Sequence, residues 1–226
     1  LGLLGRLASL IGPPRQAVGD FEPEESTQFE GGVKKQFYDG SVLLTTAVYQ
    51  LERKNIAIPD ETGVTRQVGS QRSRGFELDL AGELAPGMFL TGSYAYTDAV
   101  LTEYRESVDF SFGQQPPIIV DRAGNRPPFA PEHIFNVFLI KEFSTGLSLG
   151  VGGQYLSSQY ISVDNGFAID PSLILDASIG YQMEHWRLRL NLKNLTNADY
   201  ETRGFGATSV LPGNPLAVYL GVDFTM

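Results

Sequence analysis

Apolar and polar residues alternate along most of the chain from Glu25 onward, as they do in β-strands with two unlike faces. The alternation is clearest in residues 186–192, where Trp and Leu occupy the even positions and Arg and Asn the odd ones. A shift of one residue would exchange the two faces, so the register is strongly specified. Residues typical of strands dominate and helix signals are absent, which predicts an all-β fold. About nine strands are expected, over residues 26–37, 41–54, 65–84, 88–97, 133–143, 147–156, 172–182, 186–196 and 215–226.

The predicted connections alternate between short turns and long loops. Short turns are expected at Asp39-Gly40 and at residues 85–87, 144–146 and 183–185. The long loops are residues 55–64, 98–131, 157–171 and 199–214. Outer-membrane barrels have short periplasmic turns and long extracellular loops, and a tilted strand of about 9 to 11 residues crosses the hydrocarbon layer. The pattern therefore favours an antiparallel up-and-down transmembrane β-barrel, with a soluble β-sandwich as the alternative.

The composition excludes several classes of protein. The chain has 226 residues, a net charge of −9 and no cysteine. An acidic chain offers no clustered Lys and Arg to nucleic acid, so no nucleic-acid partner is expected. The absence of cysteine excludes disulfide scaffolds and thiolate metal sites, and two histidines cannot form a His-rich metal cage. No run of 18 apolar residues suggests a transmembrane helix.

No catalytic motif is recognised, so the protein is expected not to be an enzyme and to need no cofactor or metal. Glu77 and Asp79 share one face of a predicted strand, a spacing that a glycosidase pair could use. A hydrated, polar barrel wall explains the same spacing more simply. His133 and His185 are isolated, and we interpret them as hydrogen-bonding residues at strand ends and turns.

Five stretches, in order, resemble the carboxy-terminal half of TonB-dependent outer-membrane receptors of the siderophore type. The closest match is VGSQRSRGFELDLAGELAPGMFLTGSYAYTDA, residues 68–99. The others are FEPEESTQFEGGVKKQFYDG (21–40), AVYQLERKNI (47–56), GNRPPFAPEH (124–133) and LDASIGYQMEHWRLRLNLKNLTNADY (175–200). Each motif is short, but their order and spacing are specific. Residues 1–24, in which Pro13-Pro14 would end any helix, are expected to form an irregular segment. The resemblance implies that residues 25–226 are the carboxy-terminal part of a receptor barrel.

The resemblance also implies a function. Receptors of this family bind a ferric siderophore at their extracellular loops, and a TonB-type protein then pulls on a plug domain inside the barrel. The expected partners are thus a ferric siderophore, the TonB-type protein acting through the plug, and outer-membrane lipid. Neither a plug nor a coupling box is recognised in the 226 residues, and about nine strands cannot close a 22-stranded barrel. The stretch is therefore expected not to transport by itself. A small passive pore or structural barrel and a soluble all-β binding module remain alternatives.

Two sets of residues are candidates for function. Aromatic and arginine side chains in the long loops could bind a bulky anionic chelate by stacking and charge. These ligand-binding candidates are Tyr104, Arg105, Tyr160, Phe167, Arg203 and Phe205. The resemblance favours a structural role on the lumen-facing wall for Arg72, Arg74, Glu77 and Asp79, with the arginines pairing with carboxylates of the lumen or plug. Gly75 is expected to allow a bend or the close approach of another backbone. The chain ends at Met226 rather than at the aromatic residue usual in the family, with Phe224 on the same strand face.

Overall fold

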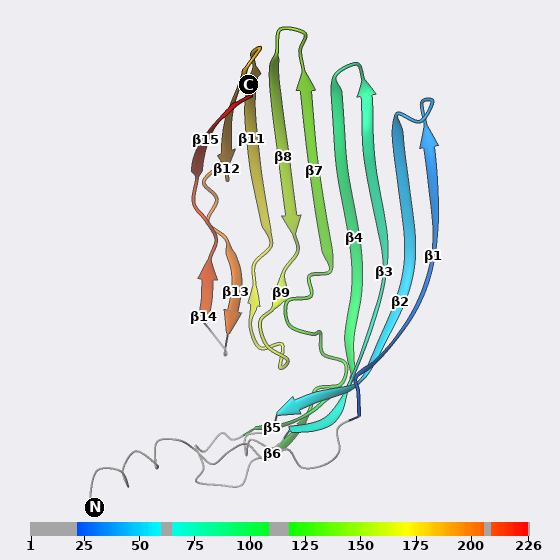
Figure 1. The fold of residues 1–226 in the computed structure, drawn as a ribbon. Coiled ribbons are helices and arrows are strands. Elements are labelled where there is room, and N and C mark those ends of the chain that lie inside the picture. Colours follow the sequence, from blue (N-terminus) through cyan, green and yellow to red (C-terminus); the bar gives the residue numbers. More distant parts are fainter. Residues whose placement is uncertain (1–21, 60–64, 109–117, 206–208, 226) are drawn as a thin grey trace, which may run out of the picture.

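The computed structural model describes residues 22–59, 65–108, 118–205 and 209–225. Nine strands form one sheet in which every neighbouring pair is antiparallel and follows chain order (Figure 1). In sheet order they are β1 (Glu25–Phe37), β2 (Val42–Pro59), β3 (Thr65–Ala85), β4 (Met88–Glu103), β7 (His133–Glu142), β8 (Leu147–Leu156), β11 (Ser172–Gln182), β12 (Trp186–Lys193) and β15 (Ala217–Phe224). No helix capable of spanning a membrane occurs in these residues.

The nine strands predicted from the sequence are all present, and the up-and-down order is confirmed. The largest differences are in β2 and β4, which continue to Pro59 and Glu103 and so extend into segments expected to be loops. β12 ends earlier than expected, at Lys193, because Asn194 adopts a φ of 51° that cannot continue a strand. Residues 1–24 were expected to form an irregular segment. Residues 1–21 lie outside the described residues, and β1 begins at Glu25.

Six further strands were not predicted, because they are two to five residues long and lie within the long loops. They form three small hairpins at one end of the sheet (Figure 1). The hairpins are β5 (Arg105–Val108) with β6 (Ile118–Asp121), β9 (Gln159–Tyr160) with β10 (Ala168–Ile169), and β13 (Glu201–Phe205) with β14 (Ser209–Pro212). The ends of the sheet therefore differ: one carries only short turns and the other carries folded loops.

The short turns are those that the sequence predicted. Asp39 and Gly40 have φ angles of 55° and 92°, the left-handed conformation that Asp-Gly turns favour. Gly87 and Gly146 also have positive φ, at 68° and 86°, in the turns after β3 and β7. Each turn connects neighbouring strands directly, so among the described residues no longer segment at this end covers the sheet.

The strand register gives the sheet one continuous apolar face. Leu190 of β12, for example, lies between Ile179 of β11 and Leu220 of β15. Leu220 is 74% exposed, so nothing in the described chain covers this face. Each strand contributes apolar residues to this face. One residue from each strand, in sheet order, is Val33, Val48, Leu78, Leu90, Leu139, Val151, Ile179, Leu190 and Leu220. We call the other side the polar face; it contains Lys34, Ala47, Glu77, Ser93, Asn136, Gly152, Asp176, Asn191 and Tyr219.

Aromatic side chains border the apolar face at two levels. Near the short turns, the rings of Trp186 and Phe224 lie 4.6 Å apart. Near the loop end, the Tyr94 hydroxyl is 2.9 Å from His133 Nδ1, and the Tyr96 ring centroid is 5.3 Å from that of His133. His133 and Glu142, the first and last residues of β7, are nine residues apart, which corresponds to ~30 Å along the strand and to ~23 Å of height at a tilt of ~40°. The two levels thus enclose an apolar band close to the ~25 Å height found in outer-membrane barrels.

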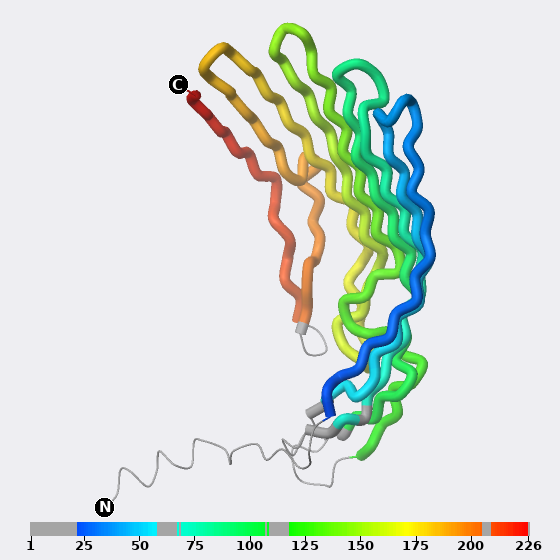
Figure 2. The backbone as a smooth tube through the Cα atoms, turned by 45° about the vertical axis from the view of Figure 1, so that its right-hand side comes forward, coloured from blue at the N-terminus to red at the C-terminus, as the bar shows by residue number. Residues whose placement is uncertain are grey.

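The nine-stranded sheet is curved and has two free edges, formed by β1 and β15 (Figure 2). Each of these strands pairs on one side only within the described residues. No second sheet packs against the apolar face in this part of the chain, which is what a soluble β-sandwich would require. The architecture is thus a segment of a barrel wall rather than a sandwich.

Candidate functional site

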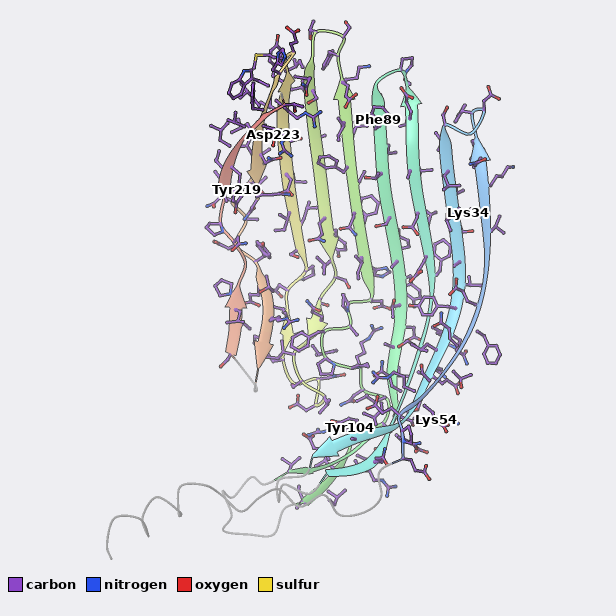
Figure 3. All side chains as sticks on the ribbon, in the orientation of Figure 1. Lys34, Lys54, Phe89, Tyr104, Tyr219 and Asp223 are labelled. Atoms are coloured by element: carbon purple, nitrogen blue, oxygen red, sulfur yellow. The ribbon has the colours of Figure 1, made fainter. Side chains whose placement is uncertain are left out.

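The loop hairpins carry the residues predicted to bind a ligand. Tyr104 lies just before β5, at the loop end of the sheet and far from Asp223 near the short turns (Figure 3). Arg105 begins β5 and lies opposite Asp121 of β6. Arg203 belongs to β13. Phe205 ends the same strand, but its side chain lies outside the described residues.

Tyr160 and Phe167 are brought together by the β9–β10 hairpin. The Ile161 N–H donates to the Phe167 carbonyl at 3.2 Å, and Tyr160 lies opposite Ala168. Ile161 is buried, and its side chain lies so close to Gly204 that a Cβ there would approach Ile161 Cγ2 to 2.8 Å. The β9–β10 and β13–β14 hairpins therefore pack against each other, with Arg203 next to the contacting Gly204 in the chain.

Residues that the sequence did not single out connect these hairpins to the loop before β7. Asn165 Nδ2 donates to the Arg126 carbonyl at 2.9 Å, and its Oδ1 accepts from the Arg126 N–H at 2.8 Å. Asn125 Nδ2 donates to the Val163 carbonyl at 2.8 Å. The Phe129 N–H donates to the Tyr160 carbonyl at 2.9 Å. The Asn165-Gly166 dipeptide is a turn signal that could have suggested such an arrangement.

The arginines of this region fall into two groups. Arg122 forms an ion pair with Glu106 at 3.0 Å, and Arg126 forms one with Glu132 at 3.1 Å. Arg105 and Arg203 are exposed and form no ion pair with another described residue. The paired arginines hold the loops in place, whereas Arg105 and Arg203 remain candidates for ligand binding.

The ionisable groups near Arg122 have shifted pKa values. Burial and the Glu106 carboxylate raise the pKa of the Tyr104 hydroxyl, and Arg122 offsets part of this effect. Hydrogen bonds from the Ser162 hydroxyl and the Gly166 N–H lower the pKa of Asp164. Near neutral pH, Tyr104 is therefore a neutral hydrogen-bond donor and Asp164 is charged. No group of three His, Asp or Glu side chains able to hold a metal ion occurs in the described part of the chain.

The structure corrects the expected position of Arg72 and Arg74. β3 runs without a bulge from Gln71 to Gly82, so even-numbered residues share the face of Phe76, and Glu77 and Asp79 lie on the opposite, polar face. The arginines thus belong to the apolar side of the sheet, beyond its aromatic border. The prediction that all four residues face the lumen is wrong for the two arginines. Arg74 pairs instead with Asp98, which lies opposite it on β4, at 2.9 Å.

The polar face carries ion pairs and shallow hollows. Lys193 Nζ is 2.6 Å from Asp176, and Arg189 is 2.9 Å from Asp223. A hollow of ≈ 490 Å³ lies near the short turns, and another of ≈ 530 Å³ lies in the middle of this face. Glycines line both, including Gly150 and Gly152. The polar face thus combines charged and small side chains with shallow hollows, and the loops above it form a separate surface.

The loop connection can be tested by Asn165→Ala. This change removes all three hydrogen bonds of the Asn165 side chain and places alanine at a φ of 55°, which asparagine tolerates better. We expect hydrogen exchange in residues 122–132 to accelerate about tenfold or more, corresponding to ~1.4 kcal/mol of lost local stability. Mass spectrometry of deuterated peptides measures this rate. Asn214→Ala is the control, because only its backbone carbonyl bonds to another described residue; equal rates in both variants would contradict the connection.

Comparison with protein families identifies the fold. Residues 5–195 match the family described as TonB dependent receptor-like, beta-barrel. The chain belongs to this family. Its members are outer-membrane receptors of Gram-negative bacteria rather than enzymes, so the apolar face of the sheet faces lipid and the polar face lines the barrel interior. The resemblance seen in the sequence motifs is confirmed.

Relatives of the chain are receptors for metal chelates. The metal-pseudopaline receptor CntO of Pseudomonas aeruginosa is 30% identical over 203 residues, which are 86% of this chain and 27% of the relative. The catecholate siderophore receptor Fiu of Escherichia coli K12 is 26% identical over 187 residues, 80% of this chain and 23% of the relative. The crystal structure of the siderophore receptor PiuA from Acinetobacter baumannii superposes with a TM-score of 0.79 at 26% identity, covering 89% of this chain and 28% of that one. The chain thus spans about a quarter of these relatives.

Proposed function

We propose that the chain forms the ligand-collecting loops and part of the wall of a receptor that imports ferric siderophores. The observation that carries this proposal is the packing of three long loops into one surface, with Tyr160, Phe167 and the exposed Arg203 on adjoining hairpins. Aromatic faces stack on catecholate or other flat ligand groups, and arginine neutralises their negative charge. The names of the relatives, which include receptors for catecholate siderophores and for metal-pseudopaline, support this ligand class.

The polar face suits contact with a plug domain. Its hollows are lined by glycine and serine, which leave space for side chains from inside the barrel. Its exposed ion pairs could exchange partners with a polar surface at little energetic expense. We propose that a plug occupies this side in the working receptor and that a TonB-type protein pulls on it to open a path. The 226-residue chain would then bind a chelate but would not import it alone.

Ligand binding tests the proposal directly. The purified protein in detergent is titrated with ferric enterobactin, a catecholate chelate, and with ferrichrome, a hydroxamate chelate. The iron-free chelators are titrated in parallel. We expect saturable binding of at least one ferric chelate, and a loss of affinity of about tenfold when Arg203 is replaced by Gln, because a charge-assisted contact of ~1.5–3 kcal/mol disappears. Isothermal titration calorimetry reports binding.

Arg187→Gln is the matched control, because Arg187 lies on the polar face near the short turns and away from the loops. Its affinity should equal that of the unchanged protein. The proposal would be overturned if the protein bound neither ferric chelate more tightly than the corresponding iron-free chelator. A steady ionic conductance of the purified protein without any chelate would instead support the passive-pore alternative.

A further inference from the structure

Hydrogen bonds around Asn194 fasten the base of the β13–β14 hairpin. Asn194 is the first residue after β12 and, at 2% exposure, the one buried polar residue in the described part of the chain. Its Nδ2 donates to the carbonyls of Ala198, at 2.9 Å, and of Asn214, at 3.0 Å. Its Oδ1 accepts from the Ala198 N–H at 2.8 Å. One side chain thus joins the residues that precede the hairpin to those that follow it.

Two further side chains complete the fastening. Asn197 Oδ1 accepts from the N–H of Leu216, one residue before β15 begins, at 2.8 Å. Asp176 of β11 accepts from the Asn194 N–H at 3.0 Å and from Lys193 Nζ at 2.6 Å. We call Asp176, Asn194 and Asn197 the base clamp. The base clamp holds both ends of the connection between β12 and β15 beside the barrel wall.

The backbone conformation of the base clamp suits asparagine. Asn194 and Asn197 have φ angles of 51° and 48°, in the left-handed region that asparagine enters more readily than most residues. The chain therefore turns out of β12 at a defined point. A buried polar group whose bonds are satisfied also rigidifies its surroundings. The hairpin is thus expected to leave the wall in one fixed direction.

Arg203 depends on the hairpin for its position. It is exposed and forms no ion pair with another described residue, so no local partner orients its guanidinium. The strand register shifts between Glu201 and Arg203, and such a bulge changes the direction in which a side chain points. Thr202 Oγ1 donates to the Leu211 carbonyl at 3.2 Å across this bulge. The place of Arg203 therefore follows from the path of the hairpin backbone.

We propose that Asn194 is a positioning residue, which through the base clamp sets the place of Arg203 on the ligand-collecting surface. The part of this inference that concerns the chelate rests on the proposed function. Asn194 is too deeply buried to touch a chelate, so any effect of its side chain on affinity passes through the hairpin. Loss of the Asn194 side chain should therefore displace Arg203 and cancel its contribution to binding.

Spin labelling of the full chain in detergent measures the place of the hairpin without any ligand. The sequence has no cysteine, so labels can be attached at Leu211→Cys on β14 and Glu184→Cys in the turn between β11 and β12, both exposed positions. We expect one narrow distribution of distances, which becomes broader or splits in N194G. Glycine adopts a φ of 51° without strain, so N194G removes the side-chain bonds alone.

N55G is the matched control for the distance measurement. Asn55 also has a positive φ, 57°, but lies on β2, at the other side of the sheet from β12 (Figure 1). The distances in N55G should equal those of the labelled protein without a further change. The role of Asn194 would be overturned if N194G left the distances unchanged, or if N55G altered them equally.

Calorimetry with ferric enterobactin and ferrichrome then tests whether Asn194 acts through Arg203. We expect N194G to weaken binding about tenfold, and R203Q to weaken it by no more than about twofold further in the N194G background. A loss of folded protein would instead leave the effect of R203Q the same in both backgrounds, and that result would overturn the proposal. Binding of neither chelate would overturn the proposed function, whereas the distances alone would still decide whether Asn194 places Arg203.

Discussion

Leu190→Arg is expected to destabilise the protein in a lipid bilayer by about 2–4 kcal/mol, because it places a charge in the middle of the lipid-facing band. Leu190 lies between Ile179 and Leu220 on the apolar face, so no polar neighbour on the adjacent strands could pair with the new guanidinium. Urea unfolding in phosphatidylcholine vesicles, followed by the fluorescence of Trp186, measures the change.

The neighbouring residue provides the control for this prediction. Asn191 follows Leu190 on β12 but faces the barrel interior, where the chain already carries Arg189 and Lys193. Asn191→Arg introduces the same side chain into a hydrated environment and should change the free energy of unfolding by less than ~1 kcal/mol. A similar loss in both variants would show that the two faces do not differ in their environment, which would contradict the assignment of lipid and interior sides.

Gly75→Ala is expected to destabilise the sheet by about 1–3 kcal/mol through overpacking. A Cβ at this position would lie 2.1 Å from the Tyr96 carbonyl oxygen and 2.8 Å from the Tyr49 hydroxyl. The close approach of another backbone predicted from the sequence is thus confirmed. Tyr49 cannot move away freely, since its hydroxyl is hydrogen-bonded to Thr97 Oγ1 at 2.9 Å. The same urea titration measures the loss.

Gly31→Ala is the matched control for this second prediction. Gly31 also lies within a strand, β1, but a Cβ there would have no neighbour within 4 Å. Alanine should be tolerated or slightly stabilising, because it restricts the unfolded chain. If Gly31→Ala destabilised the protein as much as Gly75→Ala, strand propensity rather than steric contact would explain both results.

Much of the fold could be predicted from the sequence because a period of two is visible without tertiary information. In residues 186–192 apolar and polar residues alternate one by one, and the turn at Asp39-Gly40 follows from local backbone preferences. The ends of β2 and β4 could not be predicted. Beyond the predicted ends, the two strands mix polar residues with apolar ones such as Ile56 and the buried Leu101. They continue because each has a neighbour to pair with, which is a tertiary effect.

The candidate site was only partly predictable. Aromatic and arginine residues in the loops could be selected by type, but their connection depends on Asn125 and Asn165, whose bonds join segments 38 and 39 residues apart. The error over Arg72 and Arg74 has a different origin. Alternation alone puts them on the face opposite Glu77 and Asp79, but we expected the opposite charges to pair. The backbone geometry of a strand, and not the attraction between charges, determines the face to which each side chain points.

Cysteine labelling tests the central claim, that the folded loops face the cell exterior and the short turns face the periplasm. The sequence has no cysteine, so a single introduced thiol gives an unambiguous signal. Ala123→Cys lies in an exposed loop segment before β7, and Glu184→Cys lies in the exposed turn between β11 and β12. A membrane-impermeant maleimide added to intact cells should label Ala123→Cys fully, and Glu184→Cys only after the outer membrane is permeabilised. Labelling of Glu184→Cys on intact cells, with Ala123→Cys protected, would contradict the account.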